Sequence, residues 1–507
     1  MVLLLSVLVA GELSGQCPDG SPPPCLPTPA AGATAGPRSV AVLYFDNLSP
    51  DSADAYLADG LTEEITSRLG DVGRLQVKSR NAVRRFRVAP LADFAAVGRA
   101  LTVRYLVEGS VRRAGERVRV SARLIDARTG FRVWGDDYDR ATRDLLSLQA
   151  DIASEVAIQV GGRLLPAERA RLATRPTRHP EAYDHFLRGN YYLAQRTPRA
   201  VGRAIEAYET AARLDPAFTS AIARAAYGYA LYLEWGWAYP GLPVDTLLSR
   251  GFAAAERALA RDSSATDAWM ARGYMLLHRF PRTLEGVSEA FERAISLDPN
   301  NAEAWHQYGW IRFLRGEDSS AVAAYHRALS IEQDRPATVF TIAIVSMSTR
   351  RFPEAARWLD STLALEPSFD FAYVLRALVK LRMANGPGAY ADAQAALRLG
   401  GNRLFAEAVL AVVQAGLGDT AAARARVEPL VASALGGETV SVHAGIFVGA
   451  ALVATGDSDR ALQALERVLP RGAHFFRDLG SPDFDPLRGN PRFERIVAEA
   501  RPPMGPR

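Results

Sequence analysis

The side chains that could carry out chemistry are scattered along this 507-residue sequence. No two of its histidines are four residues apart, the spacing at which a helix presents two ligands to one metal ion. The acidic pairs Glu63–Glu64 and Asp136–Asp137 fall in the first turn of a predicted helix and at a strand end, where the helix dipole and hydration explain them. GxxxxGK[ST], GxSxG and HExxH motifs do not occur. We therefore expect no catalytic residue, no cofactor and no metal site.

Basic residues are densest in RLQVKSRNAVRRFR (74–87), which contains no acidic residue. Its cations are Arg74, Lys78, Arg80, Arg84, Arg85 and Arg87. They could bind an anionic partner such as lipid headgroups, cell-envelope polymers or an acidic protein face, or they could form a solvated edge of an arginine-rich protein. The excess is local, because residues 38–178 carry 24 basic and 18 acidic side chains whereas residues 179–507 carry 36 of each. The net charge of +4 is too small to indicate a nucleic-acid partner.

The first residues indicate export. MVLLLSVLVA (1–10) has the length of a signal-peptide core and is shorter than the roughly 20 apolar residues that span a bilayer, although no basic residue precedes it. We predict a signal peptide over 1–15, a periplasmic or secreted location and no transmembrane span. A Pro/Gly-rich linker follows over 16–37. Its Cys17 and Cys25 could pair in an oxidising compartment, or they could be two uninvolved thiols.

Residues 38–178 predict an α+β domain. Apolar and β-branched runs alternate with helical periodicity in the order β-α-β-α-β-β-β-α. The last three strands should form an antiparallel meander within a mixed sheet, because three-residue turns containing Gly connect them. The predicted strands are 39–45, 74–79, 103–113, 117–127 and 131–138, and the predicted helices are 54–70, 90–101 and 145–165.

Two segments of this domain resemble a known family. SVAVLYFDNLSPDSADAYLADGLTEEITSRL and VRYLVEGSVRRAGERVRVSARLIDARTGFRVWGDDYDR look like the TolB amino-terminal-like domain, which recurs in bacterial proteins just ahead of tetratricopeptide repeats. In those proteins the domain often accompanies a kinase, cyclase or DNA-binding domain, none of which we identify in this sequence. The resemblance implies a non-catalytic accessory domain.

A 34-residue period begins after this domain. Asp298, Glu332, Glu366 and Gly400 follow one another at that spacing, each at the end of an apolar-periodic helix. The segment 302–335 resembles the tetratricopeptide repeat through Trp305, Gly309, Ala321, Tyr325 and Ala328. We expect about eight repeats over 179–473, stacked as an all-α superhelical solenoid, and a capping helix and tail over 474–507. The repeats should start near residues 182, 218, 266, 302, 336, 370, 404 and 442.

The first helix of each repeat should line the inner face of the solenoid. Its candidate protein-binding residues are Met270, Tyr274, Leu277, Glu303, His306, Trp310, Phe313, Phe340, Ile344, Met347, Val374 and Leu378. This mostly apolar set suggests a groove for a hydrophobic peptide or helix, unless several of its side chains are buried between helices. We predict a non-enzymatic interaction adaptor or scaffold of the bacterial cell envelope. The alternative is a sensor whose N-terminal domain binds a small ligand and whose repeats relay the signal to a partner.

Overall fold

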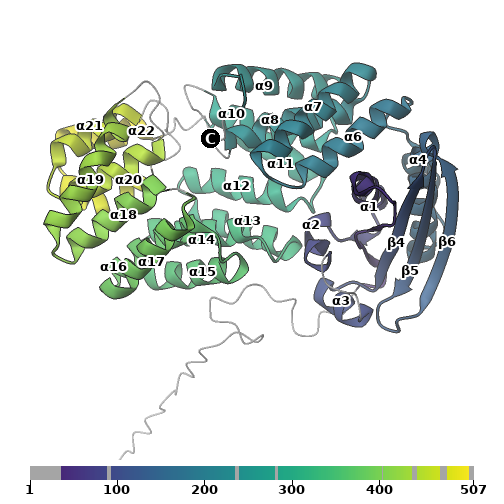
Figure 1. Ribbon diagram of the computed structural model, residues 1–507, viewed down its shortest axis with the longest axis horizontal. Helices are drawn as coiled ribbons and strands as arrows, with labels where there is room; N and C mark the ends of the chain where they lie inside the picture. The colour runs from purple at the N-terminus through teal and green to yellow at the C-terminus, as the bar shows by residue number, and fades with distance from the viewer. Residues whose placement is uncertain are drawn as a thin grey trace, which may run out of the picture. The chain divides into compact units, whose positions relative to one another are not determined.

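The computed structural model describes residues 36–87, 93–234, 239–279, 284–401, 403–436, 442–468 and 477–501. The predicted signal peptide and the candidate disulfide between Cys17 and Cys25 lie outside these residues. The chain forms two compact units that divide between Asp334 and Arg335. The first unit holds a sheet with its covering helices and four helix pairs, and the second holds four helix pairs and a C-terminal helix (Figure 1). The predicted fold class, an α+β domain followed by a helical solenoid, is confirmed.

The sheet of the first unit is mixed and has the strand order β3-β1-β4-β5-β6, with β2 paired to β4 beyond β1. The pairs among β1, β2, β3 and β4 are parallel, whereas β4, β5 and β6 form the antiparallel meander that the short turns predicted. The strands are β1 (Ser39–Val42), β2 (Asp46–Asn47), β3 (Gln76–Val77), β4 (Tyr105–Ala114), β5 (Arg117–Asp126) and β6 (Arg132–Ala141).

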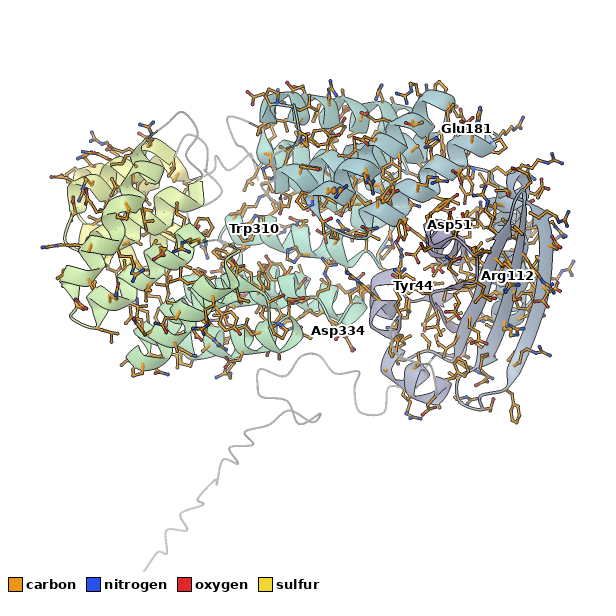
Figure 2. The ribbon with its side chains drawn as sticks, in the orientation of Figure 1. Tyr44, Asp51, Arg112, Glu181, Trp310 and Asp334 are labelled. Atoms are coloured by element: carbon orange, nitrogen blue, oxygen red, sulfur yellow. The ribbon has the colours of Figure 1, made fainter. Side chains whose placement is uncertain are left out.

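Helices cover both faces of this sheet because its strands place apolar side chains alternately on either side. Helices α1 (Ala55–Gly70) and α4 (Leu145–Gly161) lie side by side over one face. On the other face, α2 (Arg80–Val83) and α3 (Phe94–Leu101) enclose a smaller core. That core contains Ala41, Leu43, Val83, Val97, Leu101, Val103, Leu106 and Ala127. Other residues of the meander, such as Arg112 of β4, are polar and exposed (Figure 2).

Helix α5 (Pro166–Ala173) leads into the four helix pairs of the first unit. A Cβ at Gly309 would lie 2.7 Å from Cε1 of Tyr325, and one at Gly273 would lie 2.7 Å from Cζ of Phe291. Glycine at these crossings therefore lets the two helices of a pair approach closely. The helices are α6 (Pro180–Leu193), α7 (Pro198–Leu214), α8 (Thr219–Glu234), α9 (Val244–Arg261), α10 (Thr266–His278), α11 (Val287–Leu297), α12 (Ala302–Leu314) and α13 (Asp318–Ile331).

The second unit continues the same alternation of helices. The period residues Glu366 and Gly400 are the C-caps of its α15 and α17, as Asp298 and Glu332 are for α11 and α13 of the first unit. The helices are α14 (Pro336–Ser348), α15 (Phe352–Leu365), α16 (Asp370–Arg382), α17 (Gly386–Leu399), α18 (Arg403–Gly416), α19 (Thr420–Leu435), α20 (Val442–Ala454), α21 (Ser458–Val468) and α22 (Pro491–Ala500).

Helix α22 packs on α21, where it buries Phe493. The segment before it is tied to the same unit by two ion pairs, Arg350 Nη2 with Asp485 Oδ1 at 2.6 Å and Arg382 with Asp483. The C-terminal residues therefore cover apolar surface of the unit's last helices, which is the role of a capping element in a repeat array. Among all described residues, no helix is both long and apolar enough to cross a membrane.

Candidate functional site

Helix α1 carries the face that joins the α+β domain to the first helix pair. Tyr56 and Gly60 are one helical turn apart and share this face. The Tyr56 hydroxyl donates to Asp184 Oδ1 at 2.5 Å, and a Cβ at Gly60 would lie 2.9 Å from Cδ2 of Leu187. Asp184 and Leu187 belong to α6, so α1 lies directly along that helix.

Glu63, on the next turn of α1, connects three elements. Its Oε2 accepts from Arg80 Nη1 at 2.9 Å, and its Oε1 lies 3.1 Å from Nη2 of Arg224 in α8. Arg224 also places its Nε 2.6 Å from Oδ2 of Asp267 in α10. The sequence-based explanation of the Glu63–Glu64 pair is therefore wrong, because these residues lie in the middle of α1 and Glu63 serves ion pairs rather than a helix dipole. Burial raises the pKa of the neighbouring Glu64 to about 7.

A pocket of about 250 Å³ opens beside this junction. The side chain of Asp59 is only 4% exposed. It accepts hydrogen bonds from Arg87 Nη2 at 2.9 Å and from Arg80 Nη2 at 3.4 Å. The Arg80 and Arg87 guanidinium carbons lie 5.4 and 4.8 Å from the ring centroid of Tyr44, within the range of cation–π contacts. The lining residues are Tyr44, Asp59, Arg80, Arg84, Arg87, Tyr191, Ala194 and Gln195.

The pKa values of two residues in the pocket are shifted by burial. Burial raises the pKa of Asp59, against the opposing effect of Arg87 and Arg80. Burial likewise raises the pKa of Tyr44. The Nε atom of Arg80 is buried and has no hydrogen-bond acceptor. Arg84 is exposed and, among the residues that the structure describes, takes part in no ion pair.

The pocket gathers three of the six cations that the sequence singled out, namely Arg80, Arg84 and Arg87. Arg74 lies elsewhere, with its Nε 2.8 Å from Glu168 Oε1 and its Nη2 2.9 Å from the carbonyl oxygen of Arg163, and it holds α5 against the domain. Lys78 is half-buried, and the side chain of Arg85 lies outside the described part of the structure. Sequence reasoning did not identify Tyr44, Asp59, Tyr191 and Gln195, because nothing in their local pattern marks them as neighbours of the arginines.

In the first unit, the predicted groove residues divide by exposure. Met270, Tyr274, Leu277 and Phe313 are buried, and the Tyr274 hydroxyl donates to Glu303 Oε1 at 2.5 Å. The half-buried members are Glu303, His306 and Trp310. Trp310 is in α12 (Figure 2), with its ring 5.4 Å from that of Phe313. A ligand on this part of the solenoid would therefore meet the half-buried residues and not the whole predicted set.

In the second unit, Phe340, Val374 and Leu378 are buried, whereas Ile344 and Met347 are half-buried. Phe340 belongs to a row of aromatic rings that we call the phenylalanine ladder. Neighbouring ring centroids in the ladder are 4.9 to 5.8 Å apart. Its members are Phe340, Phe369, Phe371, Phe405 and Phe447.

The ladder was only partly visible in the sequence. Phe371 and Phe405 are 34 residues apart, the spacing of the other repeat columns, so a search of that period for aromatic residues would have found this pair. Phe447 does not follow the 34-residue spacing, so only the structure shows that its ring lies 5.0 Å from that of Phe405. Within the described ranges, no group of three or more His, Cys, Asp or Glu side chains is arranged to hold a metal ion.

Comparison with known proteins finds one tetratricopeptide repeat match. The tetratricopeptide repeat model matches residues 290–323, which run from α11 through α12 into α13. A putative adenylate cyclase of Rhizobium meliloti is 34% identical over 200 residues, covering 39% of this chain and 32% of that protein. The peroxisomal targeting signal receptor of Saccharomyces cerevisiae is 31% identical over 77 residues, covering 15% of this chain and 13% of the receptor. This chain thus spans a third or less of the length of these relatives.

Among solved structures, yeast Tom70 aligns over 71% of this chain and 82% of its own, with 12% identity and a TM-score of 0.38. PilW, a type IV pilus biogenesis factor, aligns over 42% of this chain and 93% of its own, with 20% identity and a TM-score of 0.36. The tetratricopeptide assignment rests on the family match at residues 290–323, whereas the TolB-like nature of residues 38–178 stays a prediction from the sequence.

Proposed function

We propose that this protein is a non-enzymatic interaction scaffold of the bacterial cell envelope whose helix pairs hold a hydrophobic segment of a partner protein. The observation that carries the proposal is the phenylalanine ladder together with the half-buried side chains next to it. Phe340, Ile344 and Met347 are four and three residues apart on α14 and share one helical face. A row of rings flanked by accessible apolar side chains offers the surface that an amphipathic helix or extended peptide buries on binding.

The tetratricopeptide match supports this proposal, since arrays of such repeats form extended binding surfaces. One relative, matched over 77 residues, is named a peroxisomal targeting signal receptor. The envelope location rests on the apolar run at 1–10 and on the two cysteines that follow it.

The scaffold proposal is tested by crosslinking in the source cells. A photoreactive amino acid at position 347 of the full chain should capture a partner protein, whereas the same amino acid at the exposed position 357 of α15 should not. Ile344→Glu should weaken the capture because it places a charge on the apolar face. Equal capture from both positions would contradict binding along the ladder, and Trp310→Glu asks whether the first unit takes part as well.

The envelope location has its own test. The mature protein should begin near Gln16 and should be about 2 Da lighter than its reduced form, because a Cys17–Cys25 disulfide removes two hydrogens. A protein that keeps Met1 would rule out cleavage of a signal peptide.

The arginine-lined pocket favours a second candidate, a sensor that binds a small ligand and relays the event through its repeats. The lining comes from the α+β domain and from the end of α6, so a ligand there would contact the junction between input domain and repeats. This candidate predicts that a small anion changes partner capture by the full-length protein, whereas the scaffold alone predicts no such change.

A further inference from the structure

We infer that the arginine-lined pocket binds a small organic anion, one bearing a phosphate or carboxylate group, and that the bound anion bridges the α+β domain and the first helix pair. This inference does not depend on the scaffold function, because it concerns a different surface from the phenylalanine ladder.

The pocket has more hydrogen-bond donors than acceptors. Arg80 gives one nitrogen to Glu63 and one to Asp59. Arg87 gives a single nitrogen to Asp59, and Arg84 enters no ion pair within the described residues. Each guanidinium carries further N–H groups. A group with several acceptor oxygens could pair with these N–H groups from more than one arginine at once.

Charge points to the same class of ligand. Three guanidinium groups and one carboxylate line the pocket, and Glu63 pairs with Arg80, so three positive charges meet two negative ones and an excess of one positive charge remains. The planar fork of arginine matches carboxylate and phosphate oxygens, and such charge-assisted hydrogen bonds are stronger than neutral ones. Tyr44 already lies against both Arg80 and Arg87, so these two cations are held in place before a ligand arrives.

Size and position select a small molecule instead of a polymer. A volume of about 250 Å³ is below the range of pockets for drug-sized ligands and fits a compact metabolite. Tyr191 and Gln195, near the end of α6, also line the pocket and offer a ring and an amide to the organic part of the ligand. Occupancy would add contacts across the junction that α1 makes with α6, and it would stabilise the docked arrangement by mass action.

The test uses the full-length protein and calorimetric titration at constant ionic strength. The probes are inorganic phosphate, glycerol 3-phosphate and succinate, with glycerol as the neutral control. We expect saturable binding of at least one anion with a Kd below about 1 mM, a rise in the melting temperature of the first unit and no binding of glycerol. The three anions distinguish free phosphate, an organic phosphate and a carboxylate as the favoured chemistry. Absence of saturable binding by all three would overturn the inference.

Variants then locate the ligand. Arg84→Ala should weaken binding about tenfold or more, since it removes a guanidinium that stabilises no other contact of the described structure. Arg99→Ala, an exposed arginine on α3 of the same domain, is the matched control and should bind as the unmodified protein does. Tyr191→Ala should weaken binding of the preferred organic probe while the melting temperature without ligand changes little. If Arg84→Ala binds like Arg99→Ala, the pocket is not the site, and if Tyr191→Ala has no effect, the ligand does not bridge.

Discussion

The two compact units use the same helix pairs for different surfaces. In the unit of residues 36–334, α8 and α10 contribute Arg224 and Asp267 to an ion-pair network that ends on α1 of the α+β domain. In the unit of residues 335–500, the first helices of the pairs contribute phenylalanine rings whose centroids lie 5.0 to 5.8 Å apart. Small residues recur at the helix crossings of both units. The other positions of each repeat can differ, so one unit can bind a domain of the same chain and the other can bind a partner.

The largest expected effect comes from breaking the ion-pair network of the first unit. Arg224→Leu removes the arginine that pairs with both Glu63 and Asp267. Because these carboxylates are mostly buried, we expect the first unit to lose about 3 kcal/mol of unfolding free energy. Calorimetry should show one transition lowered and the other unchanged. Arg403→Leu in α18 of the second unit removes an exposed arginine whose partner Glu407 keeps an ion pair with Arg426, so it should cost less than about 0.5 kcal/mol. Equal losses would remove the distinction between the two units.

The next largest effect concerns the pH dependence of folding stability, to which one carboxyl group contributes in each unit. Burial raises the pKa of Glu64 from 4.5 to about 7 in the first unit and that of Asp478 from 3.8 to about 7 in the second. The folded state then keeps a proton that the unfolded state releases, so the stabilisation is complete below the unfolded pKa and is lost as pH rises toward 7. Glu64→Gln should reduce the pH dependence of only the first transition over this range, by on the order of 3 kcal/mol, and Asp478→Asn that of only the second. Melting curves from pH 4 to 8 measure both slopes, and an unchanged slope in Glu64→Gln would assign the pH dependence to other groups.

A smaller effect separates two helical glycines. In the first unit, Gly309→Ala would push a Cβ against the fully buried ring of Tyr325, at a cost of about 1–2 kcal/mol. In the second unit, a Cβ at Gly449 meets Leu465 at an ordinary 3.4 Å, so Gly449→Ala should stabilise α20 by about 0.5–1 kcal/mol. Urea unfolding gives both values. A stabilising Gly309→Ala would show that the crossing of α12 and α13 is looser than the structure has it.

The smallest effect on stability should accompany a large effect on binding. Met347 is half-buried at the end of α14, so Met347→Glu should change the unfolding free energy by less than about 0.5 kcal/mol. The same variant should reduce partner capture because it charges the face shared with Phe340 and Ile344. Capture as strong as that of the unmodified protein would move the binding surface away from the second unit.

Much of the fold could be predicted because it depends on local patterns. The meander followed from two short turns, and the C-caps at Asp298, Glu332, Glu366 and Gly400 followed from the 34-residue period. The candidate sites were harder to predict. The sequence showed that Arg80, Arg84 and Arg87 belong to a basic segment. It did not show that Asp59 and Tyr191, from other parts of the chain, line a pocket together with them.

By itself, the sequence determined the class of each region, since periodicity, turns and caps are properties of neighbouring residues. Only the tertiary structure decided which polar groups meet. Glu63 looked like a first-turn residue of a helix and is instead the acceptor for Arg80 and Arg224, which lie 17 and 161 positions further along the chain. Buried charges stabilise a fold only when they are paired, and a pair between remote residues depends on how α1 packs along α6, which no local pattern specifies.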